Sequence, residues 1–163
     1  MSSVNILVTG PELIRDGTRG IEPVVEELIR EAQSEIQIMA YVITPHARRL
    51  ISLLEEAAKR RVAIIIVINR FEAQEEIVKQ RLRDLCACSE NVRVLNFSDP
   101  GHRELHAKIL VADRKKAVIG SANFSWGGMS ANCEVGIQVE GEPAWTLGKI
   151  VDAFAVHATA IAN

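Results

Sequence analysis

The sequence lacks the features that mark exported, membrane-embedded or disulfide-stabilised proteins. The residues from Met1 to Ile6 show neither the basic start nor the long apolar segment of a signal peptide, and no apolar stretch approaches the roughly 20 residues that cross a bilayer. The cysteines number three, which favours reduced thiols over disulfides: Cys86, Cys88 and Cys133. We therefore expect a cytoplasmic protein that makes no membrane contact.

The sequence also lacks a linker and a strong excess of charge. No segment rich in proline, glycine and serine divides the 163 residues, and 48% of them are hydrophobic, enough for one sizeable core. We expect a single domain over residues 1–163. The formal net charge of -2 is not the basic footprint of a general nucleic-acid-binding protein. The spacing of Cys86 and Cys88 is poor for zinc, so we expect both to pack at a helix end.

Apolar periodicity predicts alternating strands and helices. The run from Val62 to Ile68 is apolar at nearly every position, which is typical of an inner strand covered by helices on both faces. Pro23 indicates a helix start, and so does Thr44-Pro45, as N-cap and first helical residue. Further strands are expected over residues 4–8, 35–43, 92–96, 105–112, 117–119 and 134–139, and further helices over about 72–86 and 144–160. This order predicts an α/β sandwich around a mixed sheet.

The most informative stretch runs from Leu105 to Asp113. As a strand, it would place His106 and Lys108 on one face, because side chains alternate along a strand. An imidazole with an ordinary pKa of about 6.5 can attack phosphorus at neutral pH, and a neighbouring ammonium can hold phosphoryl oxygens as their charge builds. We therefore predict that His106 and Lys108 are catalytic and that Lys108 also binds the substrate phosphate.

A second strand is expected to return beside the first. The apolar run over residues 117–119 follows the basic turn at residues 114–116 and ends at Gly120-Ser121-Ala122-Asn123. The Ser121 hydroxyl and the Asn123 amide would then reach the same end of the sheet as His106. We predict that both bind the substrate phosphate.

Together these residues follow the spacing H-x-K-x4-D-x6-G-S-x-N, and the sequence resembles the phospholipase D superfamily, whose HKD motif has this pattern. The resemblance implies a phospholipase D-like α/β/α sandwich that cleaves a phosphodiester without a metal or other cofactor. It implies structural roles for Gly120 and for Asp113, the latter as an ion-pair partner. It also implies that Glu134 is catalytic, because it would hydrogen-bond His106 and fix its tautomer.

The motif occurs once, since none of His46, His102 and His157 is followed by lysine two residues later. Single-motif members of the superfamily place the motif at a homodimer interface, so the resemblance implies that this chain supplies half of a two-motif active site. One His106 would form a phosphohistidine, while the partner subunit's His106 would act as general acid and then activate water.

A metal site is an alternative at the same place. His102, Glu104 and His106 stand at alternate positions, so on a strand they would face one side and could bind a single ion. Pro100-Gly101, however, favours a loop at His102. A ligated His106 could not act as a nucleophile. The leading prediction therefore has no metal.

Other residues near the motif bear on the substrate. Arg103, Lys108 and the basic turn Arg114-Lys115-Lys116 would gather around the motif, which favours a polyanion, unless the turn is simply solvated. Trp126 could stack on a base, but an aromatic residue behind a packed loop is more often in the core, and we do not count it as a site residue.

The sequence thus predicts a metal-independent phosphodiesterase, in the first place a nuclease acting on DNA or RNA. A lipid-acting phospholipase D or phosphatidyltransferase, and a non-catalytic nucleic-acid-binding subunit, are the alternatives. Val8-Thr9-Gly10-Pro11, with the helix and the Tyr41 strand that follow, is similar to the phospholipase D-like proteins of DISARM anti-phage loci. That resemblance implies partners in a defence complex.

Overall fold

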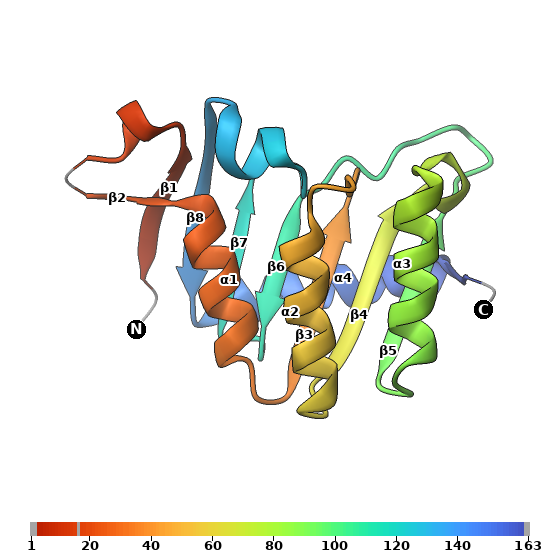
Figure 1. The fold of residues 1–163 in the computed structure, drawn as a ribbon. Coiled ribbons are helices and arrows are strands. Elements are labelled where there is room, and N and C mark those ends of the chain that lie inside the picture. The colour runs from red at the N-terminus through yellow and green to blue at the C-terminus, as the bar shows by residue number, and fades with distance from the viewer. Residues whose placement is uncertain (1–2, 16, 162–163) are drawn as a thin grey trace.

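The computed structural model describes residues 3–15 and 17–161 (Figure 1). Within these residues nine strands form one sheet in the order β2-β1-β8-β7-β6-β3-β4-β5-β9. The strands are β1 (Val4–Thr9), β2 (Thr18–Gly20), β3 (Glu35–Ala40), β4 (Ala63–Asn69), β5 (Val92–Phe97), β6 (Ile109–Ala112), β7 (Lys116–Gly120), β8 (Glu134–Glu140) and β9 (Thr159–Ala160). Because β6, β8 and β9 run opposite to the others, the sheet is mixed.

Helices cover both faces of the sheet. Three helices lie on one face, α1 (Ile21–Glu31), α2 (Arg48–Lys59) and α3 (Glu76–Ala87), and α4 (Glu142–His157) crosses the other (Figure 1). Short 3-10 turns form over Pro11–Leu13 and Phe71–Ala73, and a single π-helical turn forms over Gly127–Ala131. The predicted α/β/α sandwich is confirmed. Among the described residues, no helix has the length and apolar character needed to cross a membrane.

Two apolar clusters hold the layers together. On the three-helix face, Leu28 of α1 and Leu54 of α2 pack over the sheet with no more than 1% of their surface exposed. On the other face, Val151 of α4 packs against strand residues that include Val67. Strand β4 supplies both clusters, with Ile64, Ile66 and Ile68 on one face and Val67 on the other. This double burial explains why its sequence is apolar at nearly every position.

One edge of the sheet gathers chain segments that are far apart in the sequence. Strands β1, β3, β4, β5 and β7 end there, whereas β6 and β8 begin there. We call it the upper edge, since it lies at the top of Figure 1, and we call the opposite edge the lower edge. The antiparallel turn between β6 and β7 lies at the lower edge. Loops at the upper edge therefore join the ends of these seven strands at one surface.

Several predicted boundaries are wrong near the upper edge. Strand β3 ends at Ala40 and not at Ile43, and strand β6 begins at Ile109 and not at Leu105. The two changes have one cause, because Met39 and Ile109 form the last pair between these strands. Beyond that pair β3 turns away, and residues 105–108 lose a neighbour on that side.

Two predicted helix starts are also wrong. Helix α2 begins at Arg48, and the Thr44 hydroxyl has no hydrogen-bond partner, so Thr44 does not cap it. Instead, the Thr44 backbone N–H donates to the carbonyl of Phe124 at 3.1 Å, which holds this loop against a distant one. Helix α1 begins at Ile21, two residues before Pro23. Tertiary contacts and not the local cap signal therefore set the start of α2.

Candidate functional site

His106 and Lys108 lie together at the upper edge, just before β6 begins. Lys108 Nζ is 3.0 Å from His106 Nδ1 and 3.3 Å from Nε2, and it donates to the His106 carbonyl at 2.7 Å. The flanking Leu105 and Ile109 are buried, so the two polar side chains share a face as alternation predicts, although residues 102–108 form no strand. His106 itself is exposed. An approaching phosphate can therefore reach the imidazole with an ammonium beside it.

Lys108 combines burial with a nearby negative charge. Only 7% of its surface is exposed. Burial lowers the pKa of Lys108 from its ordinary value, and the negative charge of Glu134 opposes that change. Glu134 therefore belongs electrostatically to the site even though it comes from the start of β8.

Ser121 and Glu134 lie together, and Glu134 bonds Ser121 instead of the predicted His106. The Ser121 hydroxyl donates to the Glu134 carboxylate, and Asn132 Nδ2 donates to the same carboxylate at 3.1 Å. Among the hydrogen bonds of the described residues, none joins Glu134 to His106. The carboxylate thus orients the Ser121 hydroxyl in this structure, and its predicted bond to His106 is not formed.

Asn123 follows β7 three residues after its end. Its side-chain oxygen is buried, and no described residue hydrogen-bonds it. The π-helical turn packs directly on the backbone of Asn123, since a Cβ at Gly128 would lie 2.3 Å from the Asn123 carbonyl oxygen. Thr9 Oγ1 donates to the Gly128 carbonyl at 2.9 Å and holds that turn from β1. The Asn123 amide is therefore carried on a fixed support.

The glycine of the motif has a steric role. A Cβ at Gly120 would lie 2.6 Å from the Cα of Gly136 on the neighbouring strand β8. Any larger residue at this position would separate β7 from β8 just where Ser121 and Glu134 meet. The expected structural role of Gly120 thus has a direct geometric reason.

Tyr41 was not predicted as a site residue. It follows the end of β3, and its ring centroid lies 4.5 Å from that of His106. Lys108 Nζ lies 5.1 Å from the same ring centroid, within the range of a cation–π contact. The sequence signal was its place directly after a buried strand that ends at the upper edge, but that signal does not say which side chain it meets.

Asp113 lies away from His106 and Lys108, as expected, but its bonding partners differ from the predicted ion pair. It lies in the turn between β6 and β7 at the lower edge, where its carboxylate accepts N–H groups of the loop before β3, from Gln33 at 2.9 Å, Ser34 at 2.7 Å and Glu35 at 3.0 Å. Burial acts to raise the pKa of Asp113, but these hydrogen bonds prevail and hold it below its ordinary value. Its partners are amide groups and a hydroxyl, so the predicted ion pair is replaced by backbone capping.

The basic turn lies beside Asp113 but does not gather around His106 and Lys108, which corrects the sequence-based expectation. Arg114 pairs with Asp152 of α4 at 2.7 Å and with Glu35, and Lys116 pairs with Glu31 at 3.1 Å, all at the lower edge. These residues lie at the far end of β6 from His106 because the strand runs from the upper to the lower edge. Arg114 therefore fixes α4 to the sheet.

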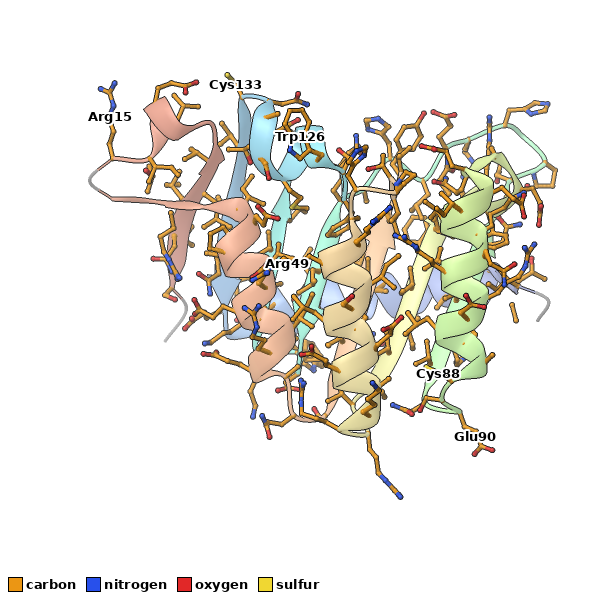
Figure 2. The ribbon with its side chains drawn as sticks, viewed as in Figure 1. Arg15, Arg49, Cys88, Glu90, Trp126 and Cys133 are labelled. Carbon is orange, nitrogen blue, oxygen red and sulfur yellow. The ribbon has the colours of Figure 1, made fainter. Side chains whose placement is uncertain are left out.

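The remaining predictions concern Trp126 and the cysteines. Trp126 is 62% exposed at the upper edge, so the expectation of a core position is wrong (Figure 2).

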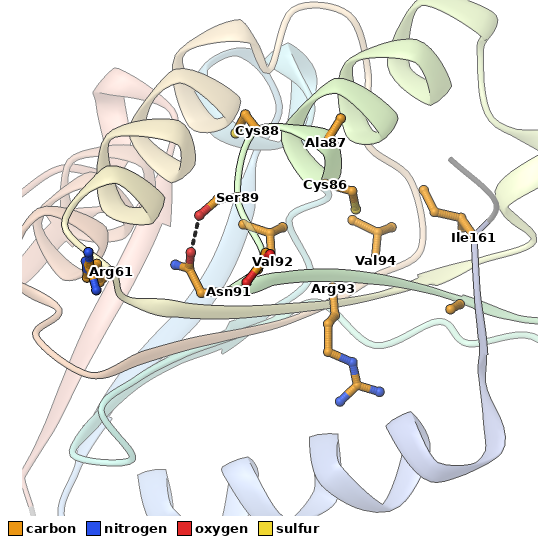
Figure 3. A pocket seen from close by; sticks show the side chains of 12 residues that line it. Arg61, Cys86, Ala87, Cys88, Ser89, Asn91, Val92, Arg93, Val94 and Ile161 are labelled. Carbon is orange, nitrogen blue, oxygen red and sulfur yellow. Dashed lines mark hydrogen bonds between the residues drawn. The ribbon is translucent and has the colours of Figure 1, made fainter.

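Cys86 and Cys88 lie at the end of α3, as expected, and line an open hollow with Val92 and Val94 near the lower end of β5 (Figure 3). Across residues 3–15 and 17–161, no three His, Cys, Asp or Glu side chains are grouped as metal ligands, and His102, Glu104 and His106 form no such group.

Comparison with known proteins identifies the class. A family model described as cardiolipin synthase, PLD-like domain, matches residues 25–157, so the chain belongs to the phospholipase D-like family. It is 30% identical over 142 residues to the DISARM protein DrmC of Bacillus paralicheniformis, an alignment that covers 86% of this chain. The chain spans only 58% of the length of that relative.

Solved structures show the same fold. The chain is similar to a phospholipase D family member, Nuc from Salmonella typhimurium, with a TM-score of 0.82, 20% identity and all of both chains covered. It is also similar to NucT from Helicobacter pylori, with a TM-score of 0.79, 18% identity, and 99% of this chain and 100% of that chain covered. The predicted superfamily and fold are both confirmed.

Proposed function

We propose that the protein is a metal-independent phosphodiesterase, a nuclease that acts on DNA or RNA. The observation that carries the proposal is the contact between the exposed His106 imidazole and the buried Lys108 ammonium at the open upper edge. An imidazole can attack phosphorus, and a fixed ammonium stabilises the charge that develops on the phosphoryl oxygens. The Asn123 amide, whose backbone packs against the π-helical turn, would add a neutral donor.

The chemistry needs two histidines, so the active unit in this proposal is a homodimer in which each chain supplies half of the site. His106 of one subunit attacks phosphorus and forms a phosphohistidine, while the partner subunit's His106 protonates the leaving oxygen. The partner's His106, now neutral, then takes a proton from a water molecule. The resulting hydroxide attacks phosphorus and breaks the phosphorus–nitrogen bond, which releases the first His106. Two in-line displacements retain the configuration at phosphorus. Trp126, exposed on the same edge, supports an interface or a substrate-binding surface there.

Nucleic acid is the proposed substrate because exposed cations stand on several loops of the upper edge. Arg70 follows β4 and pairs with Glu104, Arg103 lies shortly before His106 and pairs with Asp99, and Arg48 begins α2. A dimer through this edge would double these charges around one phosphate, which suits a polyanion. The similarity to a DISARM protein supports partners in a defence complex.

The proposed activity is tested by assaying wild type and His106→Asn on labelled single- and double-stranded DNA, RNA, bis(p-nitrophenyl) phosphate and phosphatidylglycerol vesicles in excess EDTA. We expect wild type to cleave nucleic acid and His106→Asn to lose at least roughly 10³-fold in kcat with an unchanged circular dichroism spectrum. Turnover of the vesicles alone would instead establish the lipid alternative, and no turnover of any substrate would favour a non-catalytic binding subunit.

The shared site is tested by mixing subunits. Wild type and His106→Asn are unfolded together in equal amounts and refolded, so that about one quarter of random dimers carry two wild-type chains. If both His106 residues are needed in one site, we expect activity to fall to that fraction. A fall to only about one half would show that each chain works alone and would overturn the shared site.

A further inference from the structure

Two buried side-chain amides lie beneath the candidate site and belong to no part of the motif. Asn69 ends strand β4 and is 4% exposed, and Gln74 follows the short turn after β4 and is 9% exposed. A buried polar group costs stability unless it is hydrogen-bonded, so the partners of these two amides indicate what they do.

Asn69 holds the segment that enters His106. Its Oδ1 accepts the N–H of Leu105 at 2.9 Å, and Leu105 is itself 2% exposed. Regular pairing of β6 starts only at Ile109. The bond to Asn69 therefore takes the place of a strand hydrogen bond immediately before His106.

Gln74 holds the loop on the other side of His106. Its Nε2 donates to the carbonyls of Tyr41 at 3.2 Å and of Asn69 at 2.8 Å, and its Oε1 accepts the N–H of Ile43 at 3.4 Å. One side chain thus joins the end of β4 to the loop after β3. Gln74 donates to the backbone carbonyl of Asn69, and the Asn69 side chain accepts from Leu105, so the connection from the loop after β3 to Leu105 runs through residue 69.

The two connected segments meet at the catalytic pair. Tyr41, on the loop that Gln74 holds, contacts the ring of His106 and lies under the Lys108 ammonium. His106 follows the residue that Asn69 holds. Regular pairing between β3 and β6 ends at Met39 and Ile109, and the loop after β3 is also joined to the chain after β7 by the bridge between Ile43 and Phe124. The two amides join this loop and the segment before His106 to the end of β4.

We propose that Asn69 and Gln74 are positioning residues, which fix the Tyr41 ring against His106 and Lys108 and so set the orientation of the imidazole. The expected change in kcat rests on the proposed function, whereas the expected change in the position of the Tyr41 ring does not. Misplacement of a reacting group by about 1 Å can cost roughly 10²-fold in rate. Loss of either amide is therefore expected to lower kcat while KM changes less than about threefold.

The structural consequence is tested first, by nuclear magnetic resonance of protein labelled at histidine Cε1. The chain has four histidines, and the His106 signal is the one missing from His106→Asn. Replacement of Gln74 by leucine is expected to move this signal as Tyr41→Leu does, because the Tyr41 ring no longer has a fixed place. Gln80→Leu is the control, since Gln80 is exposed on α3 and bonds only the Asp84 side chain at 2.9 Å.

The kinetic consequence is tested with paired variants at Asn69. Asn69→Leu removes the acceptor for Leu105 and is expected to lower kcat roughly 10- to 100-fold. Asn69→Asp retains an acceptor oxygen in the same place and is expected to restore kcat to within a few-fold of wild type. A purely structural role would lower thermal stability in both variants without this difference in kcat.

The outcomes separate this proposal from the proposed function. If wild type cleaves no phosphodiester, the function fails, whereas the His106 signal still tests the positioning. If Gln74→Leu does not fold, Gln74→Glu replaces it, because it keeps the acceptor for Ile43 and loses the amide donor to Tyr41. A His106 signal that moves in Tyr41→Leu but in none of the folded Asn69 and Gln74 variants would overturn the proposal.

Discussion

At the scale of single residues, Lys108 is subject to two opposing influences. Burial disfavours its charged form, and the Glu134 carboxylate favours it. The proposed mechanism needs the ammonium, because a neutral amine cannot stabilise charge on phosphoryl oxygens. The pH range of activity should therefore depend on Glu134 even though this residue bonds Ser121 and not His106.

Replacing Glu134 with glutamine gives a prediction with a definite sign. Since Glu134 raises the pKa of Lys108, its loss lowers that pKa further, and Lys108 loses its proton at a lower pH. We expect the alkaline limb of the pH profile of kcat/KM to move to lower pH. Glu140→Gln, at the lower end of the same strand, is the control and should leave the limb in place. A limb that moves upward in Glu134→Gln would contradict the electrostatic account.

At the scale of elements, one carboxylate joins two turns. Asp113 and Arg114 both have positive φ, 53° and 52°, in the turn between β6 and β7, and the Asp113 side chain caps the N–H groups of residues 33–35 before β3. Aspartate tolerates this left-handed backbone better than most residues and also supplies the acceptor. Two neighbouring strands are thereby kept in register at the lower edge.

Replacing Asp113 with alanine should lower the free energy of unfolding by roughly 2–4 kcal/mol, because the charged hydrogen bonds are lost and alanine is strained at positive φ. Denaturant unfolding and activity are measured together, and His106 chemistry should survive in the folded fraction. A variant that melts like wild type but is inactive would contradict this role.

The same carboxylate makes stability depend on pH. Its folded pKa is lowered, so its contribution is complete above the unfolded value of about 3.9 and is lost as pH falls through the folded pKa. Asp113→Asn retains an acceptor and the backbone tolerance, so it should be milder than alanine at neutral pH and should lack this part of the acid dependence.

At the scale of the whole molecule, exposed cations lie at both edges of the sheet. Arg103 stands at the upper edge near His106, where it pairs with Asp99, and Lys115 stands exposed in the turn at the lower edge. Beside Lys115, Arg114 pairs with Asp152 and Lys116 pairs with Glu31. We expect a polyanion to bind at the upper edge, because His106 and Lys108 lie there.

Charge reversal at each edge tests which edge binds the nucleic acid. We expect Arg103→Glu to raise KM for nucleic acid several-fold and to reduce the slope of affinity against salt by about 1 or more. Lys115→Glu, its control, should leave both unchanged because it lies at the far end of β6. Equal effects of the two variants would mean that the nucleic acid also contacts the lower edge.

The sequence by itself determined the superfamily, the sandwich of helices and sheet, and the two residues that meet at the upper edge. Alternating polar and apolar residues place His106 and Lys108 on one side within three residues of chain, and continuous apolar runs reveal strands buried on both faces. These are local signals, since each depends on a short segment and its solvent exposure.

Only the tertiary structure decided the other residues of the site and the positions at which the nearby strands and helices begin and end. Tyr41, Asn69 and Gln74 reach His106 through contacts across the sheet, and Glu134 bonds Ser121 because Gly120 and Gly136 let β7 and β8 approach closely. The basic turn lies far from His106 and Lys108 because β6 spans the sheet between them. Distances between segments depend on strand order and register, which no local pattern encodes.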